Sequence, residues 1–254
     1  MRDLFSLADR VALVTGAAGG LGQAAAIGLA ARGADIACVD LGAEDSAETL
    51  RRVQALGRRA IALGCDVTDE PQVRAMVERT VAQFGRVDVL VNFAGITRRI
   101  ASTEIAACDF RRVVEVNLTG TFLCCQAAGR YMVRQRRGSI VNVSSIAGLG
   151  ALGRGNAPYS ASKAGVIGLT RELAVEWGPF GVRVNVLVPV QFRTSFIAPL
   201  LADKELTDRL VAKIPLGRMG EPEEIVGPVV FLASDASSMV TGHALAVDGG
   251  YLAQ

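Results

Sequence analysis

The stretch Arg10-Val11-Ala12-Leu13-Val14-Thr15-Gly16-Ala17-Ala18-Gly19-Gly20-Leu21-Gly22 decides the fold. Its first part is a short apolar run, which is typical of a strand buried inside a parallel sheet. A glycine-rich turn follows, and an alanine-rich helix is predicted from Gln23 to Arg32, ended by Gly33. A merely flexible turn is the alternative. A glycine-rich turn placed directly between a strand and a helix favours a dinucleotide-binding loop instead.

The chemistry of that turn explains its composition. Glycines let the backbone come close to a pyrophosphate, because they carry no side chain. The start of the following helix offers free N–H groups and the positive end of the helix dipole to the same anion.

The next apolar run, Asp35–Asp40, predicts the second strand and ends on a carboxylate. An acid about 20 residues beyond the glycine turn can bind both ribose hydroxyls of NAD and repels the extra phosphate of NADP. Leu41 follows, and no Arg or Lys occurs up to Asp45. NAD is therefore the expected cofactor, and NADP is the less favoured one. A carboxylate that only caps a helix or a loop is the alternative interpretation of Asp40.

Strands and helices alternate along the rest of the chain, which predicts a doubly wound parallel α/β sheet of about seven strands with helices on both faces. The further predicted strands are 60–65, 87–92, 139–144, 181–188 and 244–247. The further predicted helices are 47–56, 70–84, 110–137, the segment that begins near Tyr159, and 221–232. Ligands bind outside the carboxyl ends of such strands, where Gly16, Asp40, Asp66 and Asn92 all fall.

Two irregular regions stand out in this pattern. Asn117 and Gly120 lie inside the predicted helix 110–137, where both residue types are unfavourable, so a local irregularity is expected there. Residues 190–220 are weakly patterned and are predicted to cover the substrate. No repeat or linker divides the chain, and residues 1–254 are expected to form one domain.

Composition excludes several classes of partner and site. The chain of 254 residues carries 27 basic and 25 acidic residues, and this balance argues against nucleic acid as a partner. No apolar run is long enough for a membrane span, and the first residues resemble no signal peptide, so a cytoplasmic protein is expected. The five cysteines lack metal-ligand spacing and are predicted to be reduced. With His243 as the single histidine, no metal site is expected.

Tyr159 and Lys163 form the candidate acid–base pair. Residues four apart share a helix face, and Pro158 suits the first turn of a helix. A tyrosine has a pKa of about 10, and a lysine ammonium beside it would move that pKa towards the working range. Taken alone, the two side chains could share a face by chance.

In combination, these motifs resemble the short-chain dehydrogenase/reductase family over Val11–Gly250. The motifs that carry the resemblance are Thr15–Gly22 (T-G-x-x-x-G-x-G), Asp66-Val67, Asn92-Phe93-Ala94-Gly95, Asn117, Ser145, Tyr159 with Lys163, and Asp248-Gly249-Gly250. The resemblance implies a single-domain Rossmann fold and hydride transfer between a nicotinamide and an alcohol or carbonyl group. It also implies a homotetramer, with the helices 110–137 and 159–177 paired across one interface.

The resemblance assigns a role to each residue. Tyr159 would exchange the hydroxyl proton, Ser145 would hold the substrate oxygen, and Lys163 would lower the Tyr159 pKa and bind the nicotinamide ribose. Asn117 would hold a water of a proton relay. Gly16, Gly20 and Gly22 would cradle the pyrophosphate, Asp66 and Val67 would flank the adenine, and Asn92 would hold the central sheet. The other residues expected at the cofactor are Gly19, Leu21, Leu41, Ala94, Gly95, Pro189 and Thr194.

Three features depart from the family pattern. Phe93 replaces an Asn, and Val190 follows Pro189 where the family has Gly. The interval from Ser145 to Tyr159 is one residue longer than usual, so Ser144 remains a competitor for the role of Ser145.

The substrate is predicted to be a small polar secondary alcohol, because the segments around residues 95–99 and 214–222 resemble gluconate 5-dehydrogenases and polyol dehydrogenases. Arg98, Arg154 and Arg193 are the candidate carboxylate ligands, and Arg99 lies in the same loops. A 3-oxoacyl-[acyl-carrier-protein] reductase is the alternative enzyme, against which Asp40 argues. A non-catalytic dinucleotide-binding protein is the alternative of another class.

Overall fold

A parallel sheet forms the centre of the molecule. The computed structural model describes residues 3–153 and 155–254. Within these ranges, seven strands pair in parallel in the order β3-β2-β1-β4-β5-β6-β7. The strands are β1 (Val11–Thr15), β2 (Asp35–Asp40), β3 (Ala60–Gly64), β4 (Val89–Asn92), β5 (Gly138–Val143), β6 (Val182–Pro189) and β7 (Ala244–Val247). The predicted doubly wound sheet is confirmed.

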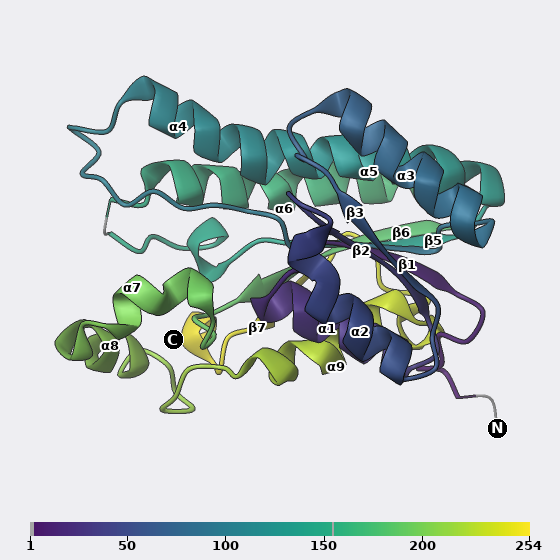
Figure 1. Ribbon diagram of the computed structural model, residues 1–254. Helices are drawn as coiled ribbons and strands as arrows, with labels where there is room; N and C mark the ends of the chain where they lie inside the picture. The colour runs from purple at the N-terminus through teal and green to yellow at the C-terminus, as the bar shows by residue number, and fades with distance from the viewer. Residues whose placement is uncertain (1–2, 154) are drawn as a thin grey trace.

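The inner strands are apolar on both faces because helices cover both faces. Every residue of β1, β4 and β5 is buried. On one face the core includes Ala25, Val53 and Val229, from α1 (Gly20–Ala31), α2 (Ala47–Ala55) and α9 (Val226–Ala233). On the other face it is built by α3 (Glu70–Phe84), α5 (Gly120–Gln135) and α6 (Ala157–Trp177). Figure 1 shows these two helical layers below and above the sheet.

Helix α3 has the predicted limits because both of its ends are capped. The Asp69 carboxylate accepts a hydrogen bond from the backbone N–H of Gln72 at 3.0 Å, and Pro71 occupies the first turn. Gly85 follows the last turn with a left-handed φ of 83°.

The predicted helix 110–137 is three consecutive segments. They are α4 (Ala107–Val114), a π-helical turn (Glu115–Thr119) and α5. The irregularity expected at Asn117 is therefore confirmed, and it is a single π-helical turn. The extra residue turns the Asn117 amide towards the loop after β4, where its Oδ1 accepts from the Ile96 N–H at 2.8 Å and its Nδ2 donates to the Ile96 carbonyl at 3.0 Å.

The segment after β6 forms a separate lobe, seen at the lower left of Figure 1. It contains α7 (Ala198–Leu201) and α8 (Lys204–Val211). Its own small apolar cluster is built around Ile197, Leu210 and Met219. The helix predicted over 221–232 begins as a 3₁₀ turn, Pro222–Ile225, and continues as α9 to Ala233.

The cysteine side chains are free thiols and mostly buried. All five cysteines are free thiols, and only Cys108 is exposed. Burial raises the pKa of Cys38 and of Cys125 to about 12. Among the helices of residues 3–153 and 155–254, none is long and apolar enough to cross a membrane.

Candidate active site

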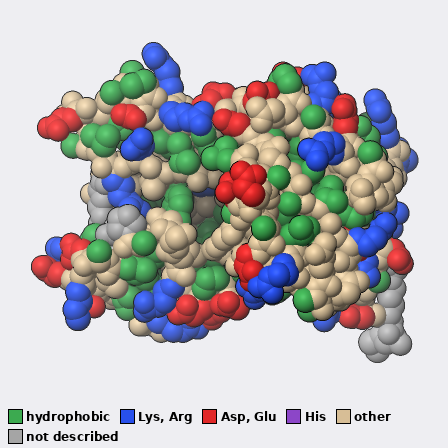
Figure 2. Space-filling view, viewed as in Figure 1, with side chains coloured by type: hydrophobic (Ala, Val, Ile, Leu, Met, Phe, Trp, Pro, Cys, Tyr) green, Lys and Arg blue, Asp and Glu red, His purple; other side chains and the backbone are tan. Residues whose placement is uncertain are grey.

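A cavity of about 430 Å³ opens at the carboxyl ends of the strands. The strand order reverses between β1 and β4, which leaves the crevice where doubly wound sheets bind ligands. Figure 2 shows the molecule hollowed at this place, with hydrophobic side chains visible inside. The predicted residues that line the cavity are Gly16, Gly19, Gly20, Leu21, Gly22, Asp40, Leu41, Asp66, Val67, Ala94, Gly95, Ser145, Tyr159, Lys163, Pro189 and Thr194.

The glycine-rich turn after β1 is tightly closed. A Cβ on Gly22 would collide with the backbone carbonyl of Gly16, so the first turn of α1 packs directly on the preceding loop. Gly19 precedes α1, and no side chain caps this helix start. The first N–H groups of α1 therefore stay available to an anion.

Two carboxylates stand at the next strand ends. Asp40 Oδ2 accepts from the Ala18 N–H at 2.9 Å, which holds the end of β2 against the glycine turn. Asp66 Oδ1 accepts from the N–H and the hydroxyl of Thr68 at 2.9 and 2.7 Å. These hydrogen bonds hold the pKa of Asp66 below its usual range.

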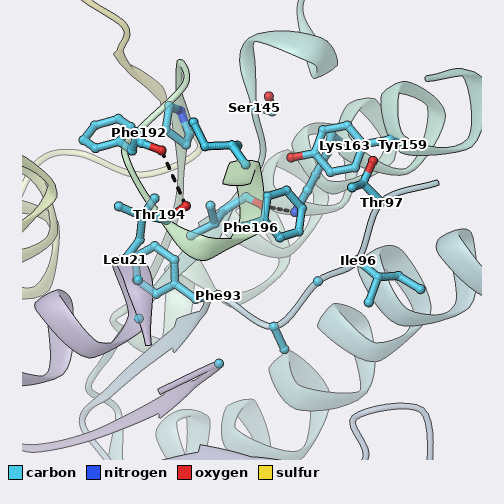
Figure 3. A pocket seen from close by; sticks show the side chains of 18 of the residues that line it. Leu21, Phe93, Ile96, Thr97, Ser145, Tyr159, Lys163, Phe192, Thr194 and Phe196 are labelled. Atoms are coloured by element: carbon cyan, nitrogen blue, oxygen red, sulfur yellow. Dashed lines mark hydrogen bonds between the residues drawn. The ribbon is translucent and has the colours of Figure 1, made fainter. Parts of the chain in front are cut away.

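The two adjacent serines after β5 have different partners. Ser144 Oγ donates to the backbone carbonyl of Lys163 at 2.7 Å and is 1 % exposed, so it ties β5 to α6. Ser145 Oγ instead accepts from the Ala147 N–H at 3.2 Å, and its hydroxyl lies near enough to Tyr159 to lower the pKa of the phenol. The structure therefore places Ser145, and not Ser144, beside the phenol, although the connecting loop is one residue longer than usual. Figure 3 shows Ser145, Tyr159 and Lys163 together at the cavity.

Lys163 is buried behind the tyrosine. Its Nζ donates to the Val143 carbonyl at 2.8 Å and lies 5.7 Å from the centroid of the Tyr159 ring. Burial lowers the pKa of Lys163 from 10.5 to about 8. A Cβ on Gly95 would lie 3.1 Å from Asn117 Oδ1 and 3.6 Å from Lys163 Nζ, so both side chains face this glycine.

One expectation about this pair is wrong. The pKa of Tyr159 is raised, because burial of the ring outweighs the hydrogen bond from Ser145 and the positive charge of Arg99. The Lys163 ammonium is directed to the Val143 carbonyl, and it is not among the groups that lower the Tyr159 pKa.

Some predicted site residues do not reach the cavity. The Asn92 amide donates to Asn142 Oδ1 at 2.9 Å between two central strands, and Asn117 is fully buried. Arg98 lies 3.7 Å from Asp109, and Arg193 lies 3.2 Å from Glu221. Neither arginine is part of the lining. Arg154 lies outside the described residues.

Several lining residues were not predicted. They include Thr97, Arg112, Leu152, Asn156, Gln191, Phe196, Lys213 and Tyr251. Of the arginines expected near the strand ends, Arg99 lines the cavity. The ring of Phe196 lies 6.3 Å from that of Tyr159. Thr97 and Gln191 follow the ends of β4 and β6 by a few residues, so the rule that ligands bind at strand carboxyl ends could have found both. In the described part of the chain, no group of three or more His, Cys, Asp or Glu side chains could hold a metal ion.

Known proteins resemble the whole chain. A family model described as enoyl-(acyl carrier protein) reductase matches residues 16–252. The cis-4-hydroxycyclohexanecarboxylate dehydrogenase of Sinomonas cyclohexanicum is 48% identical over 252 residues, 98% of each chain. The 2-dehydro-3-deoxy-D-gluconate 5-dehydrogenase of Escherichia coli K12 is 41% identical, again over 98% of each chain.

A solved structure has the same fold. The gluconate 5-dehydrogenase of Burkholderia cenocepacia J2315, in complex with NADP and tartrate, superimposes with a TM-score of 0.95 at 37% identity, over 99% of this chain and 98% of that one. These relatives are oxidoreductases of CH–OH groups by name. The chain thus belongs to the short-chain dehydrogenase/reductase family, whose members are NAD(P)-dependent oxidoreductases.

Proposed function

We propose that this protein is an NAD-dependent dehydrogenase that oxidises a secondary hydroxyl group of a small polar substrate, a sugar acid or a polyol. One observation carries the proposal: Ser145, Tyr159 and Lys163 line the same cavity, with Lys163 Nζ 5.7 Å from the centroid of the Tyr159 ring. The sugar-acid relatives support the substrate class.

The residues of the cavity fit a dinucleotide. The uncapped start of α1 and the close packing of Gly22 on Gly16 leave room for a pyrophosphate against backbone N–H groups. Asp40 would bind the adenosine ribose, and Asp66 and Val67 would lie at the adenine. Pro189 and Thr194 would lie at the nicotinamide end. When bound, the nicotinamide supplies the hydride acceptor for oxidation or the hydride donor for reduction.

Asp40 favours NAD over NADP. Its carboxylate is held at the end of β2 by the Ala18 N–H, and no basic residue occurs from Leu41 to Asp45 to balance a ribose phosphate. The Burkholderia relative contains NADP, so NADP is the competing choice.

The protein's own groups handle the substrate oxygen and its proton. Ser145 would hydrogen-bond the substrate oxygen at the position where it already meets Tyr159. During oxidation the Tyr159 oxygen accepts the hydroxyl proton, and during reduction the phenol returns it. The positive charge of Arg99 favours the phenolate. The Asn117 side chain is fully buried. We propose that a water molecule beside it belongs to a proton relay.

Turnover with NAD is the direct test. Wild-type protein is offered a panel of sugar acids, polyols and 3-hydroxyacyl compounds, with NAD and NADP compared side by side. We expect NAD reduction with at least one sugar acid or polyol. A strong preference for NADPH with an acetoacetyl thioester would instead support a 3-oxoacyl-thioester reductase.

The Tyr159→Phe variant tests the mechanism. It should lower kcat by about 10²–10⁴-fold, because the acid–base group is lost, while NADH still binds. Tyr131→Phe, on α5 away from the cavity, is the matched control and should keep wild-type kcat. Full activity of Tyr159→Phe would refute the mechanism. The homotetramer remains a proposal, and analytical ultracentrifugation tests it.

A further inference from the structure

Two buried polar atoms of the cavity lining have no hydrogen-bond partner. They are Thr97 Oγ1 and Gln191 Oε1. Elsewhere in residues 3–153 and 155–254 the same lack is found on Ser46, Arg58 and Asn92, none of which lines the cavity. A buried polar group without a partner is unfavourable, so two of them in one site point to a ligand that satisfies them.

The strands that precede these two residues lie on either side of the strand that precedes Ser145. Thr97 follows β4, Ser145 follows β5 and Gln191 follows β6, and β5 lies between the other two strands. A substrate oxygen held by Ser145 would therefore have Thr97 on one flank and Gln191 on the other. In Figure 3 the Thr97 hydroxyl lies on the same side of the cavity as Tyr159.

Both groups can serve a hydroxyl. The Thr97 hydroxyl donates and accepts, and the Gln191 amide presents an acceptor oxygen and a donor nitrogen. The same lining also contains apolar side chains, among them Ile96, Leu152 and Phe196, which offer a hydroxyl no partner.

We propose that Thr97 and Gln191 determine specificity by binding hydroxyl groups on the carbons next to the one that is oxidised. The preferred substrates are then compounds with vicinal hydroxyl groups, and simple secondary alcohols are poor substrates. This inference rests on the proposed dehydrogenase function, since it assigns partners around the reacting oxygen of that same site.

Matched alcohols that differ in one hydroxyl test this assignment. The probes are butane-2,3-diol against butan-2-ol, and cyclohexane-1,2-diol against cyclohexanol. The measured quantity is the ratio of kcat/KM for diol over monool. A single hydrogen bond contributes about 3- to 10-fold, and each diol has one hydroxyl more than its monool, so the wild-type ratio should be about 3 to 10. Where turnover is too slow, the ratio of inhibition constants against the best panel substrate replaces it.

Variants assign the effect to the two residues. For each diol, Thr97→Val or Gln191→Leu, whichever removes the partner of its second hydroxyl, should lower the diol-to-monool ratio by about 3- to 10-fold, while the KM for NAD stays near wild type. Thr97→Ser keeps the hydroxyl and should keep the ratio. Thr103→Val and Gln83→Leu, both exposed and outside the cavity lining, are matched controls.

Three results would overturn the inference. One is a wild-type ratio near one, and another is a ratio that neither variant changes. The third is a Gln191→Leu variant that raises the KM for NAD alone, since its partner would then be the cofactor. Failure of every alcohol and sugar acid to reduce NAD would refute the dehydrogenase function itself. Equal turnover of diols and monools would refute only the role of Thr97 and Gln191.

Discussion

Lys163 should make the stability of this protein depend on pH in a defined window. Its side chain is 5 % exposed, and burial lowers its pKa from 10.5 to about 8. Replacing it by Met keeps the length of the side chain and removes the charge. The hydrogen bond to Val143 is lost as well, but the part of that loss that does not depend on the charge of Lys163 cancels when two pH values are compared.

The sign follows from proton binding. The folded-state pKa lies below the unfolded one, so between pH 8 and 10.5 the unfolded chain binds more protons at Lys163. The free energy of unfolding therefore rises with pH across this window. Below pH 8 the lysine is charged in both states and the cost of burying the charge is fully present. One pKa unit corresponds to about 1.4 kcal/mol, so the gain from pH 7.5 to pH 10 is about 2–3 kcal/mol.

Urea unfolding of wild type and Lys163→Met at pH 7.5 and pH 10 measures this gain. The unfolding free energy of wild type minus that of Lys163→Met should be about 2–3 kcal/mol more positive at pH 10 than at pH 7.5. The range stops at pH 10 because a tyrosine ordinarily titrates near 10, and burial raises the pKa of Tyr159 from that value. Lys204→Met, at a side chain that is 88% exposed, is the control. A difference that stays constant between the two pH values would refute the reasoning.

Four further substitutions separate the roles assigned around the cavity. Ser145→Ala should lower kcat by about 10²–10³-fold, whereas Ser144→Ala should lower the unfolding free energy by about 1–3 kcal/mol with a much smaller effect on kcat; steady-state kinetics and urea unfolding distinguish them, and equal kinetic effects would contradict the assignment. Asp40→Ala should raise the NADP-to-NAD ratio of kcat/KM by about 10-fold or more, and an unchanged ratio would remove Asp40 from cofactor choice. Gly22→Ala should weaken NADH binding by about 10-fold or more in a fluorescence titration, because its Cβ displaces the turn at Gly16, while Gly168→Ala, whose Cβ meets nothing within 4 Å, should bind as wild type.

The fold could be predicted because its signals are local and repeated. Each strand is an apolar run, and caps such as Asp69 and Gly85 fix helix ends in the sequence itself. The π-helical turn was expected only as an irregularity at Asn117. Its form depends on the bonds that Asn117 makes with Ile96, a residue far away in sequence.

The cofactor end of the site was more predictable than the substrate end. The glycine turn and Asp40 lie at strand ends, whose positions the fold determines. The choice between Arg98 and Arg99 depends instead on loop torsions, and Arg193 meets Glu221, an acid from another loop. The raised pKa of Tyr159 depends on burial by surrounding elements, which no spacing between residues reports.

The π-helical turn Glu115–Thr119 also constrains how the gene can change. Consecutive residues of an α-helix are rotated by about 100° around its axis. Deleting one residue within the turn would restore regular winding, but it would rotate all of α4 relative to α5 and turn the Asn117 amide away from Ile96. Substitutions on the outer face of these helices leave that geometry intact. Over evolutionary time, this region should therefore vary in composition while its length stays fixed.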